Sequence, residues 1–528
     1  MIPQPVLLAG LSIAFGWRVR GQFGHEAGAA MAGALVALAI ALLSGREDWR
    51  RRVAYFAMFG ALGWAFGGSM SYMKVVGYCH SSDSATVLYG FAGLFLIGFL
   101  WAAMGGAGIA LPAVLASERM AGLFPAVAAV FGAWFLQDIV VDWRRAAPAA
   151  PAVLGERVTD VAGLARLDAD WVAAAVAIVA VLALAALRRR IDTGVSLVLH
   201  LAVGWWLAFA GLVLVLGLRL NPPRGDNWAG CVGLFAGLML FCRRHRLGDV
   251  AAASLITGLL GATGFCLGQM IKLAFISTGA QWGWHALMEW FHGLFFGLAA
   301  SVAMARLIRR GPAVDERPLP AWTGVFALVF LLWVIPYLNF RRSPGLWLRN
   351  WKSLPEQVHG IALMAGFAPS KGFVGWFELV YLAFGAVLLA LAVRHVRRAL
   401  PVVPETWLGK GQVLYLAFLW FVTLMSFAHE LSAMNPVGWV LQWGVTINAL
   451  LCTYLVMGAA APAPAEIAPA GPAYSGWLRR TVALGLLSAV GCSLGGWALK
   501  RRLFGDAFAP HFYMNHIRFG PNNTNDRR

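Results

Sequence analysis

Apolar residues in this chain fall into long runs that are separated by short polar connections. The runs are roughly 16 to 25 residues long, the length at which a helix crosses the hydrocarbon core of a bilayer. They are too long and too uniformly apolar for the alternating strands of a membrane barrel. The pattern therefore predicts an all-α, polytopic integral membrane bundle of about 14 to 15 transmembrane helices.

We expect the first apolar run to be retained as a span, because it lacks a basic leader region and a clear small-residue cleavage site. The candidate spans lie at roughly 3–17, 27–44, 53–77, 86–115, 120–141, 171–187, 195–217, 228–242, 250–275, 284–305, 321–339, 373–394, 412–430, 437–459 and 479–498.

The polar connections predict no separate soluble domain, because the longest are about 20 to 30 residues and too short to bury a core of their own. Residues 1–498 are interpreted as one polytopic transmembrane domain, and 499–528 as a polar C-terminal tail. Two segments, about 18–116 and 222–310, share an Arg-Gly entry, a short glycine-containing helix, an Arg-rich turn and a Gly-rich helix. They are read either as an internal repeat, a feature of many transporters, or as a likeness of composition alone.

Orientation follows from the Arg-dense connections, which favour the cytoplasm. These connections lie at 45–52, 188–194, 243–249, 306–311 and 394–398. They share one side of the predicted topology, which places the N-terminus in the cytoplasm and the loops at 18–26 and 221–228 outside. Two features leave the orientation open: a short apolar piece at 361–368, and the basic segment 500–502, whose cytoplasmic preference conflicts with an odd number of spans.

Composition agrees with a membrane protein: 60% of residues are hydrophobic, 12% are charged and the mean hydropathy is +0.70. The net charge of +18 is explained by Arg and Lys flanking the spans. Because no basic stretch joins a nucleic-acid-binding signature, nucleic acid is excluded as a partner. The six cysteines form no CxxC pair and predict no disulfide framework.

Several catalytic signatures are missing from the sequence, including the GxxxxGK[ST] loop and HExxH. Their absence argues against an ATPase motor and a zincin. We assign no cofactor and no metal.

The span starting at Trp284 carries an unusual polar stripe. His285, Glu289 and His292 stand at i, i+4 and i+7, so they share one helix face. Because such groups are expensive in hydrocarbon, we expect the stripe to face the protein interior and to meet a charged partner. The proposed partners come from other helix ends on the same side, namely His25, Glu26, His429 and Glu430.

The stripe has three interpretations: a metal site, an acid/base or proton-relay group, and a structural hydrogen-bond network. The metal interpretation is incomplete, because the His25-Glu26 and His429-Glu430 pairs are adjacent in the sequence rather than spaced as Glu-x-x-His. The catalytic candidates are His285, Glu289, His292, His25 and Glu26.

A second group of polar residues gathers at the predicted outer ends of the helices. Arg with Asn suits carboxylate or phosphate oxygens, and Trp beside Asn and Asp suits sugar rings. Anchoring at the membrane interface is the alternative for each Trp. The substrate-binding candidates are Arg18, Arg20, Arg224, Asp226, Asn227, Trp228, Arg349, Asn350, His429 and Glu430. Arg20 and Arg224 share an Arg-Gly context, so we expect them to line a common anion pocket.

Three functions are compatible with these patterns. The first is a permease or flippase-like transporter for a polar, anionic or glycan-bearing solute in the bacterial cytoplasmic membrane. The second is a membrane-embedded transferase that acts at the outer leaflet on a lipid-linked sugar or acyl donor. The third is a non-catalytic assembly subunit. The expected partners are the lipid bilayer and either a polar or anionic small molecule or a lipid-linked glycan.

Overall fold

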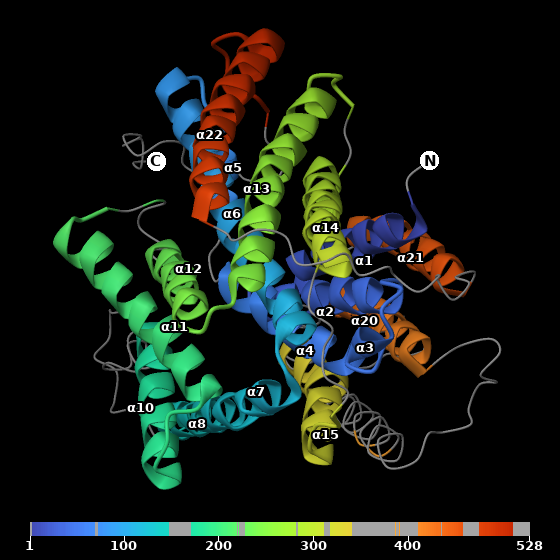
Figure 1. The fold of residues 1–528 in the computed structure, drawn as a ribbon. Coiled ribbons are helices and arrows are strands. Elements are labelled where there is room, and N and C mark those ends of the chain that lie inside the picture. The colour runs from blue at the N-terminus through green and yellow to red at the C-terminus, as the bar shows by residue number, and fades with distance from the viewer. Residues whose placement is uncertain are drawn as a thin grey trace. The chain divides into compact units, whose positions relative to one another are not determined.

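The computed structural model describes residues 3–68, 72–146, 170–218, 220, 227–280, 283–310, 317–340, 386, 390, 410–433, 436–457 and 475–510. All regular elements in these ranges are helices (Figure 1). Nine of the described helices are long and apolar enough to cross a membrane, and shorter apolar helices cover 27–42, 53–67 and 442–457. The all-α prediction is confirmed for this part of the chain.

The described chain forms two compact units. The first comprises 1–114, 252–314 and 320–528, and the second comprises 115–251 and 315–319. The helices of the first unit are α1 (Gln4–Phe23), α2 (Ala27–Leu42), α3 (Glu47–Arg50), α4 (Val53–Gly67), α5 (Met73–Tyr78), α6 (Ser84–Val114), most of α13 (Gly248–Ile276), α14 (Trp284–Arg310), α15 (Ala321–Val329), the π-helix η2 (Phe330–Val334), α16 (Ile335–Phe340), α20 (Lys410–Ala433), α21 (Pro436–Met457) and α22 (Ser475–Phe504).

Helices of the first unit approach one another through glycines. A Cβ on Gly293 of α14 would lie 2.5 Å from the carbonyl oxygen of Ile13 in α1, and one on Gly297 would lie 2.6 Å from that of Ala9. On α4, a Cβ on Gly63 would lie 2.5 Å from the carbonyl oxygen of Met104 in α6. Close backbone approach through small residues is the usual way in which membrane helices pack. The glycines thus explain why α1 lies against α14 and α4 against α6.

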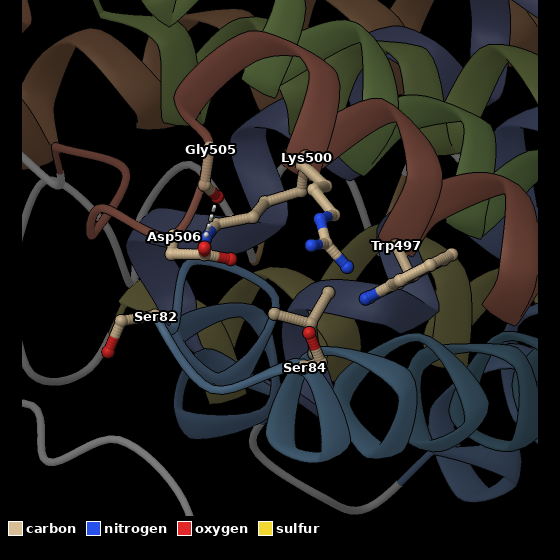
Figure 2. A pocket seen from close by; sticks show the side chains of 8 residues that line it. Ser82, Ser84, Trp497, Lys500, Gly505 and Asp506 are labelled. Atoms are coloured by element: carbon tan, nitrogen blue, oxygen red, sulfur yellow. Dashed lines mark hydrogen bonds between the residues drawn. The ribbon is translucent and has the colours of Figure 1, made fainter.

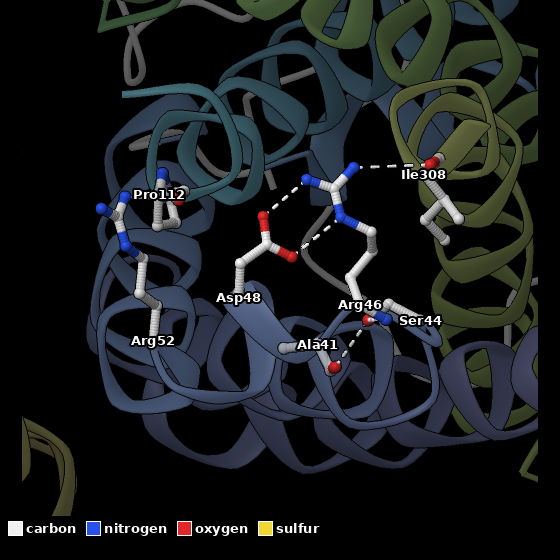
Figure 3. Close-up of polar contacts among 7 residues, drawn as sticks. All are labelled: Ala41, Ser44, Arg46, Asp48, Arg52, Pro112 and Ile308. Carbon is white, nitrogen blue, oxygen red and sulfur yellow. Dashed lines mark hydrogen bonds and ion pairs between the residues drawn. The ribbon is translucent and has the colours of Figure 1, made fainter. Parts of the chain in front are cut away.

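One end of this unit is formed by the Arg-rich turn at 44–52, and we call it the basic end. Arg46 donates to the carbonyl oxygen of Ile308 near the end of α14, at 3.5 Å, and Arg52 donates to that of Pro112 near the end of α6, at 3.2 Å (Figure 3). Asp48 accepts a hydrogen bond from Arg46 at 2.8 Å. These guanidinium groups satisfy carbonyls that the helix ends leave without intrahelical partners.

The opposite end, called the polar end, is defined by Arg20 and Glu289. The start of α1 lies toward the basic end, because Arg20 of the polar end stands in the last turn of this helix. Gln4, at the start of α1, donates to the carbonyl oxygen of Leu455 near the end of α21. Ala509, which follows α22, lies at the polar end, because its amide donates to the carbonyl oxygen of His80. The basic segment 500–502 therefore lies within α22, at the end opposite to the Arg-rich turn.

The second unit contains α7 (Ser117–Ala121), α8 (Leu123–Ala146), α10 (Asp170–Arg188), α11 (Thr193–Phe209), the π-helix η1 (Ala210–Val215) and α12 (Asn227–Arg244). Asp192 caps α11 by accepting from the amide of Val195. Small and β-branched residues of α8, α10 and α11 form its core, among them Ala126, Val181 and Ala202.

Two predicted span boundaries are wrong. The span at 3–17 continues as helix to Phe23, so Arg18 and Arg20 are helical residues rather than loop residues. Gly24, with φ of 114°, ends the helix in a conformation that glycine adopts readily. The span at 53–77 ends at Gly67, where a Cβ on the following Gly68 would overlap the indole of Trp101. The chain resumes as α5 at Met73.

Candidate functional site

A buried ion pair lies at the polar end of the first unit. Arg20 of α1 and Glu289 of α14 are joined by a 2.9 Å contact between Nη2 and Oε1, and their side chains are only 2% and 6% exposed. The prediction that the Glu289 stripe faces the interior and meets a charged group is confirmed for this residue. The partner is Arg20, which the sequence had assigned to substrate binding, and not one of the four proposed residues.

Tyr72 and His25 complete the polar contacts of the pair. Arg20 donates to the Tyr72 hydroxyl at 2.6 Å, and this hydroxyl donates to Glu289 Oε1 at 2.8 Å. Arg20 Nη1 lies 3.2 Å from His25 Nδ1, which must be the acceptor because a guanidinium only donates. Burial, helped by the Arg20 guanidinium, lowers the pKa of His25 to about 4. The ring is therefore neutral near pH 7 and able to accept this hydrogen bond.

Two glycines make room for the pair. A Cβ on Gly21 would lie 2.6 Å from Glu289 Oε2, and a Cβ on Gly28 would lie 2.9 Å from Arg20 Cγ. Any larger residue at either position would press on the side chains that form the ion pair. The Arg-Gly sequence at the end of α1 is thus explained by packing: Arg20 supplies the charge, and Gly21 leaves space for the carboxylate.

The guanidinium rests on aromatic rings. The Arg20 Cζ lies 4.7 Å from the ring centroid of Trp17, 5.1 Å from that of Tyr72 and 5.4 Å from that of Trp101. Trp17 and Trp101 in turn meet edge to face at 5.0 Å, and both indoles are fully buried. Rings at these distances attract a desolvated cation. They therefore stabilise the guanidinium in addition to its carboxylate partner.

His285 and His292 extend the site along α14. His285 Nε2 lies 3.7 Å from Glu289 Oε1, with 16% of its side chain exposed. His292 is fully buried and stacks on Phe265 of α13 with ring centroids 3.8 Å apart. A Cβ on Gly268 would lie 2.3 Å from His292 Cδ2, so this glycine admits the imidazole between the two helices.

The face of α13 that carries Phe265 brings two more polar residues to the site. Gln269 is fully buried, and neither its amide nitrogen nor its carbonyl oxygen has a hydrogen-bond partner among the described residues. Lys272 is 3% exposed and interacts electrostatically with Glu289 and Cys79. Buried polar groups are normally hydrogen-bonded, so the Gln269 amide has unused capacity to bind a polar ligand.

A separate polar cluster joins α1, α20 and α21. Gln22 donates to Glu430 at 2.6 Å and accepts from Ser426 at 2.6 Å, and Gln442 donates to Ser426 at 2.7 Å. The ring of His429 lies 4.8 Å from that of Phe23. Glu430 and His429, which were predicted to meet the Glu289 stripe, thus contact Gln22 and Phe23 at the end of α1.

The remaining predicted residues are dispersed. Glu26 is exposed at the start of α2, and Arg18 is half-buried. In the second unit, Asn227 donates a hydrogen bond to Asp170, and Trp228 is 9% exposed. Arg224, Asp226, Arg349 and Asn350 lie outside the described residues. The described residues contain no group of His, Cys, Asp and Glu arranged to hold a metal ion.

A shallow surface recess lies where α22 approaches the start of α6. It has an empty volume of about 170 Å³, and its lining includes Lys500, Trp497 and Ser84 (Figure 2). Lys500 donates to the carbonyl oxygen of Gly505 at 3.1 Å, across the end of its own helix. The Lys500 side chain in this recess is thus engaged with the C-terminal end of its own helix, and we assign the recess no chemistry.

Three contributors to the site were missed by the sequence reasoning: Tyr72, Gln269 and the Trp17–Trp101 pair. Tyr72 lay inside an expected continuous span, where an aromatic residue signals nothing unusual. Gln269 and Lys272 stand at i and i+3 on an otherwise apolar helix, and this spacing was a usable signal.

Comparison of the chain with known families, curated proteins and solved structures gives no match.

Proposed function

We propose that this chain is a multi-pass permease for a polar, anionic solute in the cytoplasmic membrane of a bacterium. Integration into a membrane is supported by the nine long apolar helices among the described residues and by large apolar side chains on their outer faces. Leu187 of α10 is 83% exposed, Leu207 of α11 is 70% exposed and Leu487 of α22 is 69% exposed. Exposed apolar surface of this kind suits contact with lipid.

The observation that carries the proposal is the buried Arg20–Glu289 pair, whose guanidinium lies against aromatic rings. Ionisable groups inside a membrane bundle mark solute or ion pathways by default, because they are expensive to keep there. A guanidinium presents a planar set of donors that matches carboxylate and phosphate oxygens. Lys272 adds a basic group and Gln269 adds unused hydrogen-bonding capacity on the facing helix. Together these groups suit an anion that enters from the polar end.

The two other functions are less well supported. An outer-leaflet transferase needs reactive groups open to its lipid-linked donor, whereas Glu289 and His292 are 5% and 0% exposed. An assembly subunit needs only stable packing, and well-packed apolar residues of similar volume stabilise a core at least as well as a buried ion pair. An occluded binding site between helices is what alternating access requires of a permease at one stage of its cycle.

Uptake into proteoliposomes tests the proposal. The purified protein is first screened for thermal stabilisation by acetate, succinate, glycerol 3-phosphate and glucuronate, and uptake of the radiolabelled best stabiliser is then measured. We expect uptake above that of protein-free liposomes, and we expect Arg20→Lys to abolish it because an ammonium lacks the planar fork. Arg51→Lys at the basic end, where the side chain is 56% exposed, is the matched control. Equal uptake by the Arg20→Lys and Arg51→Lys variants would contradict the assignment of Arg20.

A further inference from the structure

We infer that Glu289 is a built-in substitute for the transported anion, and that one proton taken up by its carboxylate releases Arg20 to bind that anion. The inference rests on the proposed function and specifies it as proton-coupled transport of an anion with carboxylate, sulfonate or phosphate oxygens. It is based on the observation that one oxygen of the Glu289 carboxylate accepts hydrogen bonds from both Arg20 and Tyr72.

Glu289 occupies the place that a ligand oxyanion would take on Arg20. Its Oε1 accepts from Arg20 Nη2 at 2.9 Å and from the Tyr72 hydroxyl at 2.8 Å. A ligand oxygen in the same position would receive the same two donors. The internal carboxylate therefore competes with any external anion, and the site opens to a ligand only when this carboxylate loses its charge.

Protonation of Glu289 removes the negative charge that compensates the buried Arg20 guanidinium. A guanidinium stays charged at every pH that a protein experiences, and a buried cation without a counter-charge is strongly destabilising. The rings of Trp17 and Trp101 keep Arg20 in place when the carboxylate is neutralised. The fixed cation then favours entry of an anion. Proton and anion binding are thus positively coupled, and the coupling acts equally in both directions.

The surroundings of Glu289 are suited to this exchange. Arg18 and Arg20 face it from α1, Lys272 faces it from α13, and His285 and His292 share its face of α14. His25 contacts Nη1 of Arg20, and Tyr72 bridges Arg20 to the carboxylate. His285 lies 3.7 Å from Oε1, and its side chain is 16% exposed compared with 6% for Glu289. It is therefore the group on this stripe through which a proton from the polar end reaches the carboxylate.

The test measures how the affinity for methanesulfonate depends on pH, using the full-length protein in nanodiscs. Methanesulfonate stays a monoanion from pH 5 to pH 8, so any pH dependence belongs to the protein. Thermal midpoints at several methanesulfonate concentrations, with sodium chloride keeping the ionic strength constant, give an apparent Kd. For the unaltered protein we expect the Kd to rise about tenfold for each pH unit, because one proton must bind with each anion.

Two glutamate variants make the test specific. Glu289→Gln carries a permanently neutral side chain, so it should bind methanesulfonate with the same Kd at pH 5 and pH 8. Glu47→Gln, the same change at a side chain that is 64% exposed at the basic end, should keep the pH dependence of the unaltered protein. The inference is overturned if the Kd of the unaltered protein does not depend on pH. This measurement does not require any variant to fold. The inference is equally overturned if Glu289→Gln keeps the pH dependence or binds no methanesulfonate at pH 5.

The outcomes separate this inference from the proposed function. If the affinity follows the expected pattern but no anion is taken up by proteoliposomes, the proton-linked exchange stands and the permease assignment fails. If an anion is taken up but the affinity does not change with pH, the permease stands and Glu289 is not the coupling group.

Discussion

At the scale of single residues, Arg20 and Glu289 depend on each other. Each is a charged side chain that is almost fully removed from solvent, and each satisfies the charge of the other. In a low-dielectric interior, removing one partner leaves an uncompensated charge, whereas removing both leaves only a packing defect. The contribution of either side chain to the free energy of unfolding therefore depends on whether the other one is present.

We expect Arg20→Leu and Glu289→Leu each to lower the free energy of unfolding by about 3–5 kcal/mol, because each leaves a buried charge without its partner. The double variant should lose clearly less than the sum of the two single losses. Unfolding in mixed micelles with increasing denaturing detergent measures all four proteins of this cycle. Strictly additive losses would show that the two side chains do not interact.

Gly21 sets the position of the Glu289 carboxylate. In Gly21→Ala the new methyl group would lie 2.6 Å from Oε2, so the carboxylate must move away from Arg20. We expect a loss of about 1–3 kcal/mol of stability, typical of overpacking. A Cβ on Gly132 of α8 would meet nothing within 4 Å, so Gly132→Ala is the matched control and should leave the thermal midpoint unchanged or slightly raised. Equal midpoints for the two variants would contradict the crowding at Gly21.

At the scale of elements, the pairing of α1 with α14 brings the ion pair together. Glycines of α14 let the backbone of α1 approach closely, and the two helices run antiparallel, so that Gly10 lies near Leu294 while Gly21 lies near Glu289. The break between α4 and α5 brings a third residue, Tyr72, to the ion pair. Because the helix ends at Gly67, Tyr72 is free to reach the pair instead of continuing along a helix.

Gly293→Ala should disturb the site from a distance of one helical turn. Its methyl group would lie 2.5 Å from the carbonyl oxygen of Ile13 and 2.6 Å from the Cα of Ala14, and backbone atoms cannot rotate away. We expect this variant to be less stable than Gly21→Ala and to bind anions more weakly, because α1 must shift along with Arg20. Gly491→Ala on α22, where a Cβ would meet nothing within 4 Å, is the control. A thermal midpoint of Gly293→Ala equal to that of Gly491→Ala would argue against the proposed helix contact.

At the scale of the whole molecule, the first unit separates its charged groups between two ends. The basic end collects Arg46 and Arg52, which hold the ends of α14 and α6. The polar end collects the Arg20–Glu289 pair. Arginine-rich turns favour the cytoplasm, so from the turn at 44–52 we expect the anion site of the proposed permease to face the outside, which leaves the basic segment 500–502 of α22 on the same side as that site.

Cysteine labelling in whole cells tests the orientation. All six native cysteines are buried, so they contribute little background. We expect Glu26→Cys at the polar end to react with an impermeant maleimide added outside. We expect Glu47→Cys at the basic end to react only after the membrane is permeabilised. The reverse pattern would invert the topology.

The sequence alone predicted the all-helical class of the described chain and the burial of Glu289 and His292. Both are local properties: run length predicts a helix suited to a bilayer, and the i, i+4, i+7 spacing of His285, Glu289 and His292 puts them on one face that hydrocarbon disfavours. The partner of that stripe was decided only by tertiary structure. Arg20 lies 269 positions from Glu289 in the chain, and the pairing depends on glycine contacts and a helix break that no local pattern encodes. Burial follows from the composition of one helix, whereas partnership follows from the packing of several.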